Sequence, residues 1–323
     1  MRIAFIQIPI SAYYKPWTIS ASPGFHGRAE FGGFGGNYAR MLLTAIVLIA
    51  TAGPRTWCAD LALASELYQR SDYHAALREL KSATTGEPEA LFLSGKIHYM
   101  LGDYKEAVNL LTEATQRSGS ESSYFNWLGK SYGRLAESAG IFSAPRYASR
   151  CRQAFEKAVE LGPANLEALS DLMEYYLEAH GFLGGGLAQA ESLVPRIETI
   201  DSAQGHYARS RLAEKRKDYG AAEQQLRRAA ELAPRQVGRL IDLARFLARH
   251  GRLKESEQVF VKAAKIAPAS PKLLFARAKS YIETRQNVDE ARRLLVAYLK
   301  SPLTPDDPPR RDAERLLESI GGG

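Results

Sequence analysis

The sequence predicts an all-α protein, a solenoid of about seven helix–turn–helix repeats followed by a C-terminal capping helix. Three observations predict this fold. After about residue 60, small residues recur at a period near 34, a large apolar residue follows each of them at a fixed distance, and prolines end several of the units. Self-similarity at such a period indicates stacked units that share one continuous core.

Composition sets the outer limits of the interpretation. The chain has 323 residues, 45% of them hydrophobic, 43 Lys and Arg against 36 Asp and Glu, and two cysteines. It is therefore long enough for a sizeable core and is no disulfide scaffold. Residues 60–323 hold 38 basic and 35 acidic side chains. This near balance gives no reason to expect nucleic acid as a partner.

The N-terminal residues are predicted to lie apart from the repeats. Residues 1–40 lack any helical or strand periodicity, and we interpret them as a non-native or disordered extension, with translation starting at or near Met41. Residues 42–52 form an uncharged apolar run of 11 residues. A membrane span needs about 20 such residues, whereas the core of a signal peptide needs roughly 7–15. We therefore predict a signal peptide over 41–59.

Export has two consequences for the mature protein. It is expected to be periplasmic or secreted, with no stable membrane insertion after cleavage behind Ala52 or Ala59. A weaker alternative is an N-terminal helix that is never cleaved and anchors the chain.

The repeats are predicted over 60–304. The small residue near the start of each second helix is Ala76, Ala107, Cys151, Ala190, Ala222, Ser256 and Ala291. The large apolar residue four positions later is Leu80, Leu111, Phe155, Val194, Leu226, Phe260 and Leu295. Small residues let two helices approach closely at their crossing, and the large residue fills the space beside them.

This unit resembles the tetratricopeptide repeat (TPR), most clearly in residues 90–114 and 237–268. The resemblance implies a right-handed superhelix whose first helices line a concave groove. It also implies that the protein binds other proteins or peptides and is not an enzyme. Residues 124–234 are in addition similar to exported bacterial TPR proteins of unassigned activity.

Two repeats are longer than the others. The spacings between successive small residues of the second helices are 31, 44, 39, 32, 34 and 35, which places insertions of about ten and five residues in repeats three and four. The insertions are predicted within 135–150 and 180–188, side by side on one edge of the solenoid. Their candidate binding residues are Phe142, Phe182, Gly184, Gly185 and Gly186. The glycine N–H groups could hold an anion, or the glycines could simply permit a difficult turn.

The C-terminal residues 305–323 are predicted to form the capping helix and tail. Asp306 or Asp307 is expected to cap that helix, with Pro308 or Pro309 in its first turn. One apolar stripe would then pack on repeat seven, formed by Ala313, Leu316, Leu317 and Ile320.

The first helices carry candidate groove residues. In TPR proteins the ninth position of the first helix faces the groove, and here it is basic in five of seven repeats: Lys96, Lys130, Arg211, Arg245 and Lys279. Arg134 adds to this charge, and Tyr99 and Tyr207 offer flat contact area. Such a groove would attract an acidic protein or peptide. Alternatively, the ninth position only tolerates long polar side chains, and nearby glutamates dilute the field.

The TPR domains that bind the acidic tails of cytosolic chaperones use a set of Lys and Asn residues. Asn126 stands where that set has lysine, and Gln204 and Ala208 stand where it has two cations. The set is not reproduced here. Asn126 nevertheless remains a candidate groove residue.

Signatures of catalysis and of cofactor or metal binding are weak in this sequence. Gly129-Lys130-Ser131 lacks the earlier glycine of a phosphate-binding loop and falls within a predicted helix. The six histidines are scattered, so we predict no metal and no cofactor. Cys151 takes the place of a packing alanine and is expected to be buried.

The sequence therefore predicts a non-enzymatic scaffold of the cell envelope or periplasm. Its partner would be a protein or peptide bound in the concave groove. The alternative is a protein, or an enzyme, that binds a small ligand or glycan in a pocket between 135–150 and 180–188. The oligomeric state is not predicted.

Overall fold

The computed structural model describes residues 54–83 and 86–321 of the chain. The N-terminal extension 1–40 and the apolar run 42–52 lie outside the described residues. The predictions of a late start and of an export signal are therefore not tested by the fold.

The described residues form helices and no strands, arranged as seven antiparallel pairs plus a final helix. The first helices of the pairs are α1 (Pro54–Gln69), α3 (Pro88–Leu101), α5 (Ser122–Ser138), α7 (Leu166–Glu178), α9 (Ser202–Lys215), α11 (Val237–Arg249) and α13 (Pro271–Glu283). The second helices are α2 (Tyr73–Ala83), α4 (Tyr104–Arg117), α6 (Ala144–Leu161), α8 (Leu187–Ile200), α10 (Tyr219–Leu232), α12 (Leu253–Ile266) and α14 (Val288–Lys300). Each helix packs chiefly on its neighbours in the chain, which confirms the predicted solenoid of helix pairs.

Small residues sit at the crossings of the pairs, as predicted. Ala107 and Ala263 are fully buried. At Gly129 an added Cβ would lie 2.5 Å from the ring of Phe155, which is the large residue of the same repeat. The close approach of α5 and α6 thus requires a residue without a side chain.

The two long repeats differ in how they absorb their extra residues. In repeat three the extra residues lengthen the helices, so that α5 has 17 residues and α6 has 18. In repeat four they form a turn that includes the 3₁₀ helix η1 (Gly181–Leu183). Residues of α6 contact η1, which brings the turn of repeat four against the second helix of repeat three.

The ends of the solenoid differ in detail from the sequence prediction. The helix α1 begins at Pro54, six residues before the predicted start of the solenoid at residue 60. The capping helix α15 (Arg310–Ser319) exists, and its apolar stripe packs with α13 and α14 around the buried Ala313. Neither Asp306 nor Asp307 caps it, because Pro309 takes the N-cap position. The Asp307 carboxylate instead accepts hydrogen bonds from the backbone N–H and the hydroxyl of Thr304, both at 2.9 Å.

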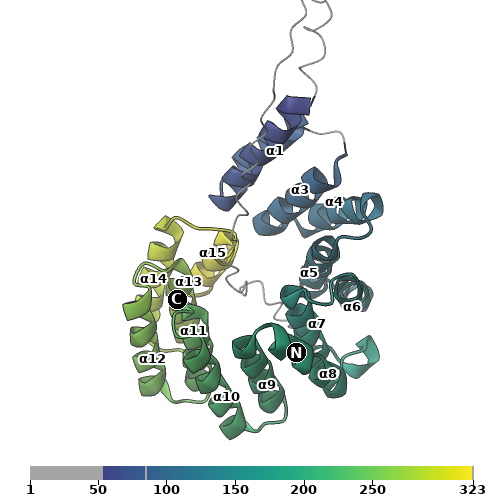
Figure 1. The fold of residues 1–323 in the computed structure, drawn as a ribbon. Coiled ribbons are helices and arrows are strands. Elements are labelled where there is room, and N and C mark those ends of the chain that lie inside the picture. The colour runs from purple at the N-terminus through teal and green to yellow at the C-terminus, as the bar shows by residue number, and fades with distance from the viewer. Residues whose placement is uncertain (1–53, 84–85, 322–323) are drawn as a thin grey trace, which may run out of the picture.

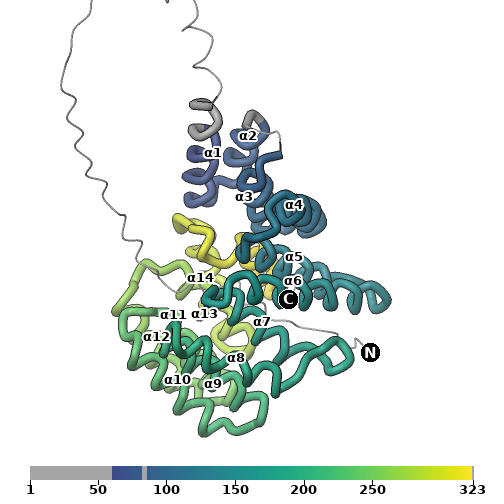
Figure 2. The backbone as a smooth tube through the Cα atoms, turned by 45° about the vertical axis from the view of Figure 1, so that its right-hand side comes forward, coloured from purple at the N-terminus to yellow at the C-terminus, as the bar shows by residue number. Residues whose placement is uncertain are grey.

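The helix pairs curve around a central space (Figure 1). The final helix α15 lies on the inner side of this curve and reaches the early repeats, as both views show (Figure 2). The contact is direct: Arg134 Nη2 on α5 lies 3.3 Å from Asp312 Oδ1 on α15. Arg311 also donates to the carbonyl of Gly102, at 3.4 Å. The two ends of the solenoid therefore meet across its concave side.

Candidate functional site

A cavity of about 820 Å³ lies on the concave face. The first helices α5, α7, α9, α11 and α13 contribute side chains to its wall, and α15 adds side chains from the C-terminal end of the chain. Its lining includes six of the predicted groove residues: Tyr99, Arg134, Tyr207, Arg211, Arg245 and Lys279. The structure thus brings together residues that lie up to 180 positions apart in the chain.

Lys130 is the most buried of the predicted groove cations, with only 2% of the residue exposed. Its ammonium forms an ion pair with Glu167 and lies 3.3 Å from Asp171 Oδ2, both on α7. Burial alone would lower the pKa of Lys130, but these two carboxylates outweigh it and raise that pKa above its usual value. Lys130 therefore joins repeats three and four and presents little charge to a partner.

Arg211 has a similar role one repeat later. Its guanidinium lies 3.0 Å from Glu174 and 2.9 Å from Glu178, both on α7, and 2.8 Å from Glu214 on its own helix. The charge of Glu174 is the main reason why the pKa of Arg211 is raised. Three carboxylates thus surround one cation, which stabilises the stacking of α9 on α7.

The remaining predicted cations of the cavity also have carboxylate neighbours. Arg245 Nη2 lies 3.9 Å from Glu283 Oε1, and Lys279 Nζ lies 3.8 Å from the same oxygen. Burial, with help from the charge of Arg245, lowers the pKa of Lys279. The wall of the cavity therefore alternates positive and negative charge. The cavity wall is therefore less positively charged than the number of basic residues in the predicted groove suggests.

The groove next to repeats one to three has a different character. The ammonium of Lys96 lies 4.5 Å from the centre of the Tyr68 ring and 5.0 Å from that of Trp127. Cation–π attraction of this kind holds a lysine over aromatic faces. Tyr99 is buried and meets the Trp127 ring edge-on at 5.4 Å between ring centres, so it supports this cluster more than it offers contact area.

Asn126 belongs to the buried network below the groove. It is 1% exposed, and its amide donates a hydrogen bond of 3.0 Å to Asp171 Oδ2. Further along, the Gln204 amide donates to Ser170 Oγ at 3.0 Å, and Arg239 donates to Gln204 Oε1 at 2.6 Å. This row of polar contacts between successive first helices was not predicted from the sequence. The feature of the sequence that could have predicted these contacts is the presence of polar residues at positions of the first helices that are otherwise apolar.

Tyr207 is half-buried in the cavity wall, with the Arg239 guanidinium 5.6 Å from its ring centre. Burial raises the pKa of the Tyr207 hydroxyl, as does the charge of Glu174. The phenol therefore remains a neutral hydrogen-bonding group inside the cavity.

The glycines of the inserted edge do not offer their N–H groups to an anion. Gly184 N donates to Gly181 O at 2.9 Å, Gly185 N to His180 O at 3.2 Å, and Gly186 N to Tyr176 O at 2.8 Å. Gly184 has φ +82°, and a Cβ on Gly185 would lie 1.9 Å from the carbonyl oxygen of Ala179. The three glycines are therefore used to build the turn, and the anion hypothesis is wrong.

The aromatic residues of the inserted edge point outward. Phe142 is 98% exposed, and Phe182 is 74% exposed and stacks on His180. Neither residue covers the neighbouring helices, and neither lines the cavity or the smaller hollow described below. The small-ligand alternative stays a prediction.

Other groups of the described residues bear on thiol chemistry, metal binding and membrane insertion. Cys151 is a free thiol buried in the core, as expected, and burial raises its pKa well above the usual value. Among the described residues no three His, Cys, Asp or Glu side chains are grouped to hold a metal ion. In the same residues no helix is both long and apolar enough to cross a membrane.

Comparisons with known proteins agree with this architecture. Residues 61–123 and 207–271 match the family model described as tetratricopeptide repeat. A TPR protein of known structure from Parabacteroides merdae is 14% identical over 83% of this chain and 100% of its own, with a TM-score of 0.55. A thermophilic TPR protein from Thermus thermophilus is 20% identical over 59% of this chain and 98% of its own, with a TM-score of 0.50. Likeness at these identities shows the fold alone. A search among curated proteins gave no match.

Proposed function

We propose that this tetratricopeptide repeat protein is a non-enzymatic scaffold that binds an extended segment of a protein partner in its concave groove. The observation that carries the proposal is the surface beside repeats one to three. There Tyr68, Lys96 and Trp127 form a cationic and aromatic cluster that lines a hollow on the concave face. Trp and Tyr side chains are enriched among the few residues that contribute most of the binding energy at protein interfaces.

In the rest of the groove, the charged side chains would contribute more to the choice of partner than to the strength of binding. Its cations are paired with carboxylates from adjacent repeats, for example Arg249 with Glu214 at 2.7 Å. A partner must exchange such pairs for its own contacts, which disfavours partners with unmatched charges.

The site of action is proposed to be the cell envelope or periplasm. This part of the proposal is supported by the apolar run of residues 42–52, which has the length of a signal-peptide core. Fractionation of cells that express the full chain tests it. We expect a processed protein, shortened to begin near residue 53 or 60, in the osmotic-shock fraction. An unprocessed chain that stays with the spheroplasts would contradict it.

Site-specific photocrosslinking tests the scaffold proposal. A photoreactive amino acid replaces Lys279, which faces the cavity, or Glu231, which is exposed at the end of the second helix α10. We expect a discrete crosslinked partner from position 279 in the native cell and none from position 231. Equal patterns from both positions, or none from either, would count against partner binding in the groove.

A further inference from the structure

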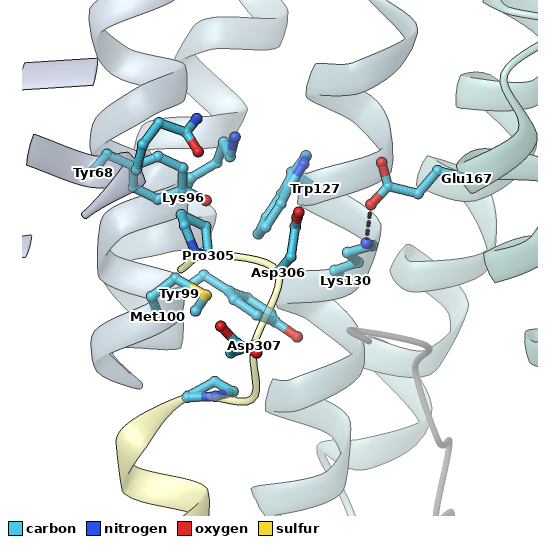
Figure 3. A pocket seen from close by; sticks show the side chains of 12 residues that line it. Tyr68, Lys96, Tyr99, Met100, Trp127, Lys130, Glu167, Pro305, Asp306 and Asp307 are labelled. Atoms are coloured by element: carbon cyan, nitrogen blue, oxygen red, sulfur yellow. Dashed lines mark hydrogen bonds and ion pairs between the residues drawn. The ribbon is translucent and has the colours of Figure 1, made fainter. Parts of the chain in front are cut away.

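A segment of the chain itself lies in the groove beside repeats one to three. After α14 the residues Thr304–Pro309 cross this end of the concave face before α15 begins. Figure 3 shows Pro305 and Asp306 beside Lys96 and Trp127. The same hollow is lined by side chains from α1, α3, α5 and α7, and only about 40 Å³ of it remains empty next to the segment.

The segment has its own local structure. Asp307 is bonded to Thr304, as described above, and Tyr298 on α14 donates a hydrogen bond to the carbonyl of Pro308. Three of the six residues are prolines, which fix extended backbone and lose little freedom on binding. The two aspartates have no basic neighbour within the segment. The groove therefore holds an acidic peptide bounded by prolines.

The surface around the segment is suited to that chemistry. Lys96 supplies a positive charge held near three aromatic rings, and Trp127 supplies a flat apolar face of the kind on which proline-rich peptides bind. The hydroxyl of Tyr68 is buried without a hydrogen-bond partner in a residue that is 2% exposed. A buried hydroxyl in this state is an available donor for a ligand carbonyl or carboxylate. The tail segment fills most of the hollow but makes no hydrogen bond with the Tyr68 hydroxyl.

We propose that this end of the groove is a binding site for an acidic, proline-bounded peptide, and that Thr304–Pro309 occupies it in cis until a partner segment replaces it. The proposal rests on the proposed scaffold function and names the ligand. The tethered segment competes at a high effective concentration, so a free peptide binds the intact protein weakly. Loss of the tail contact raises the fraction of protein whose site is open, and the apparent affinity rises in proportion.

The test is fluorescence anisotropy with a labelled peptide of residues 303–310, Leu-Thr-Pro-Asp-Asp-Pro-Pro-Arg. It is titrated with the full chain, with Asp306→Lys and with the matched control Glu314→Lys. Glu314 is exposed on α15 and carries the same charge change outside the hollow. We expect Asp306→Lys to bind at least about tenfold more tightly than the other two proteins. The double variant Asp306→Lys/Lys96→Met should bind the peptide no more tightly than the intact chain does. Asp306→Lys should likewise show no gain in affinity for a peptide in which both aspartates are replaced by asparagine.

A second variant covers the case in which Asp306→Lys misfolds. Tyr298→Phe weakens the tail from α14 without touching the hollow, and it should tighten peptide binding several-fold. Equal affinity for the intact chain, Asp306→Lys and Tyr298→Phe would overturn the occupancy of the site in cis. Absence of peptide binding to all of them would overturn the ligand assignment. If position 279 still captures a partner in the cell, that failure leaves the scaffold function intact.

Discussion

At the scale of single residues, close helix crossings are the most sensitive points of this fold. Gly129→Ala should lower the free energy of unfolding by about 1–3 kcal/mol, because the new Cβ would lie 2.5 Å from the Phe155 ring in a packed crossing. Gly140→Ala is the matched control, since an added Cβ there meets no atom within 4 Å. Urea unfolding followed by circular dichroism measures both. Equal midpoints would show that α5 and α6 can separate without cost.

The buried carboxyl of Asp171 should make stability depend on pH. Burial raises the pKa of Asp171 to about 7 against the opposing effect of Lys130, whereas in the unfolded chain it titrates near 3.8. Between these values the folded protein keeps a proton that the unfolded chain has lost. The contribution of Asp171 to stability is therefore complete below about pH 4 and is lost as the pH rises towards 7.

Asp171→Asn removes this dependence while keeping the shape of the side chain. The difference in unfolding free energy between the variant and the parent should change in favour of the variant as the pH rises from 4.5 to 7. The slope can approach 1.4 kcal/mol per pH unit, the limit for one proton. Chemical denaturation at several pH values measures it. A difference that is constant with pH would contradict the raised pKa.

The groove cations show what the sequence can and cannot predict about a site. The repeat pattern placed Lys130 and Arg211 on the concave side, because their position within the first helix is fixed by the small residue before them. Their partners Glu167 and Glu174 lie 37 residues away on a neighbouring repeat. Which carboxylate meets which cation depends on how α7 is rotated against α5 and α9. That rotation has no local signature, so the pairing was not predicted.

At the scale of the elements, the helix pairs were predictable because their pattern is local. The small and large residues that define one pair lie within a single repeat. The spacing of the small residues predicts the insertion of repeat three within 135–150 but does not specify its form. Its apolar residues Leu135, Ala144 and Ala148 continue the buried faces of α5 and α6, so the extra length becomes helix instead of loop.

Repeat three allows the stability contributions of an exposed and a buried phenylalanine to be compared. Phe142→Ala should change the unfolding free energy by less than about 0.5 kcal/mol, because the ring is 98% exposed. Phe155→Ala in the same repeat should cost about 3–5 kcal/mol, since that ring is fully buried. Thermal and urea unfolding compare the two variants. A large cost at Phe142 would mean that this ring is covered in the protein in solution.

At the scale of the whole molecule, the meeting of the two ends was not predictable from the repeats. The contacts that join α15 to the early repeats link residues 178 and 209 positions apart. Small rotations between successive repeats add up along a solenoid, and their sum decides whether the ends meet. Tyr298 is one residue whose contact with the tail the repeat pattern does not predict. It is fully buried among the residues of the last helix pair, and its hydroxyl donates a hydrogen bond to the carbonyl of Pro308 in the tail.

Closure of the molecule by α15 should be reversible. Asp312→Asn with Arg311→Ala removes the ion pair to Arg134 and the hydrogen bond to Gly102, and should increase the radius of gyration in small-angle X-ray scattering. The control, Glu314→Gln with Arg293→Ala, makes the same change of charge on exposed side chains. Raising salt from 0.15 to 1 M shortens the screening length from about 8 to about 3 Å, so high salt should expand the parent protein as well. The expansion should be smaller in the Asp312→Asn/Arg311→Ala variant, because its ion pair is already gone. If all three proteins scatter alike at both salt concentrations, these contacts do not hold the ends together, and the tail must be retained by Tyr298 and the prolines alone.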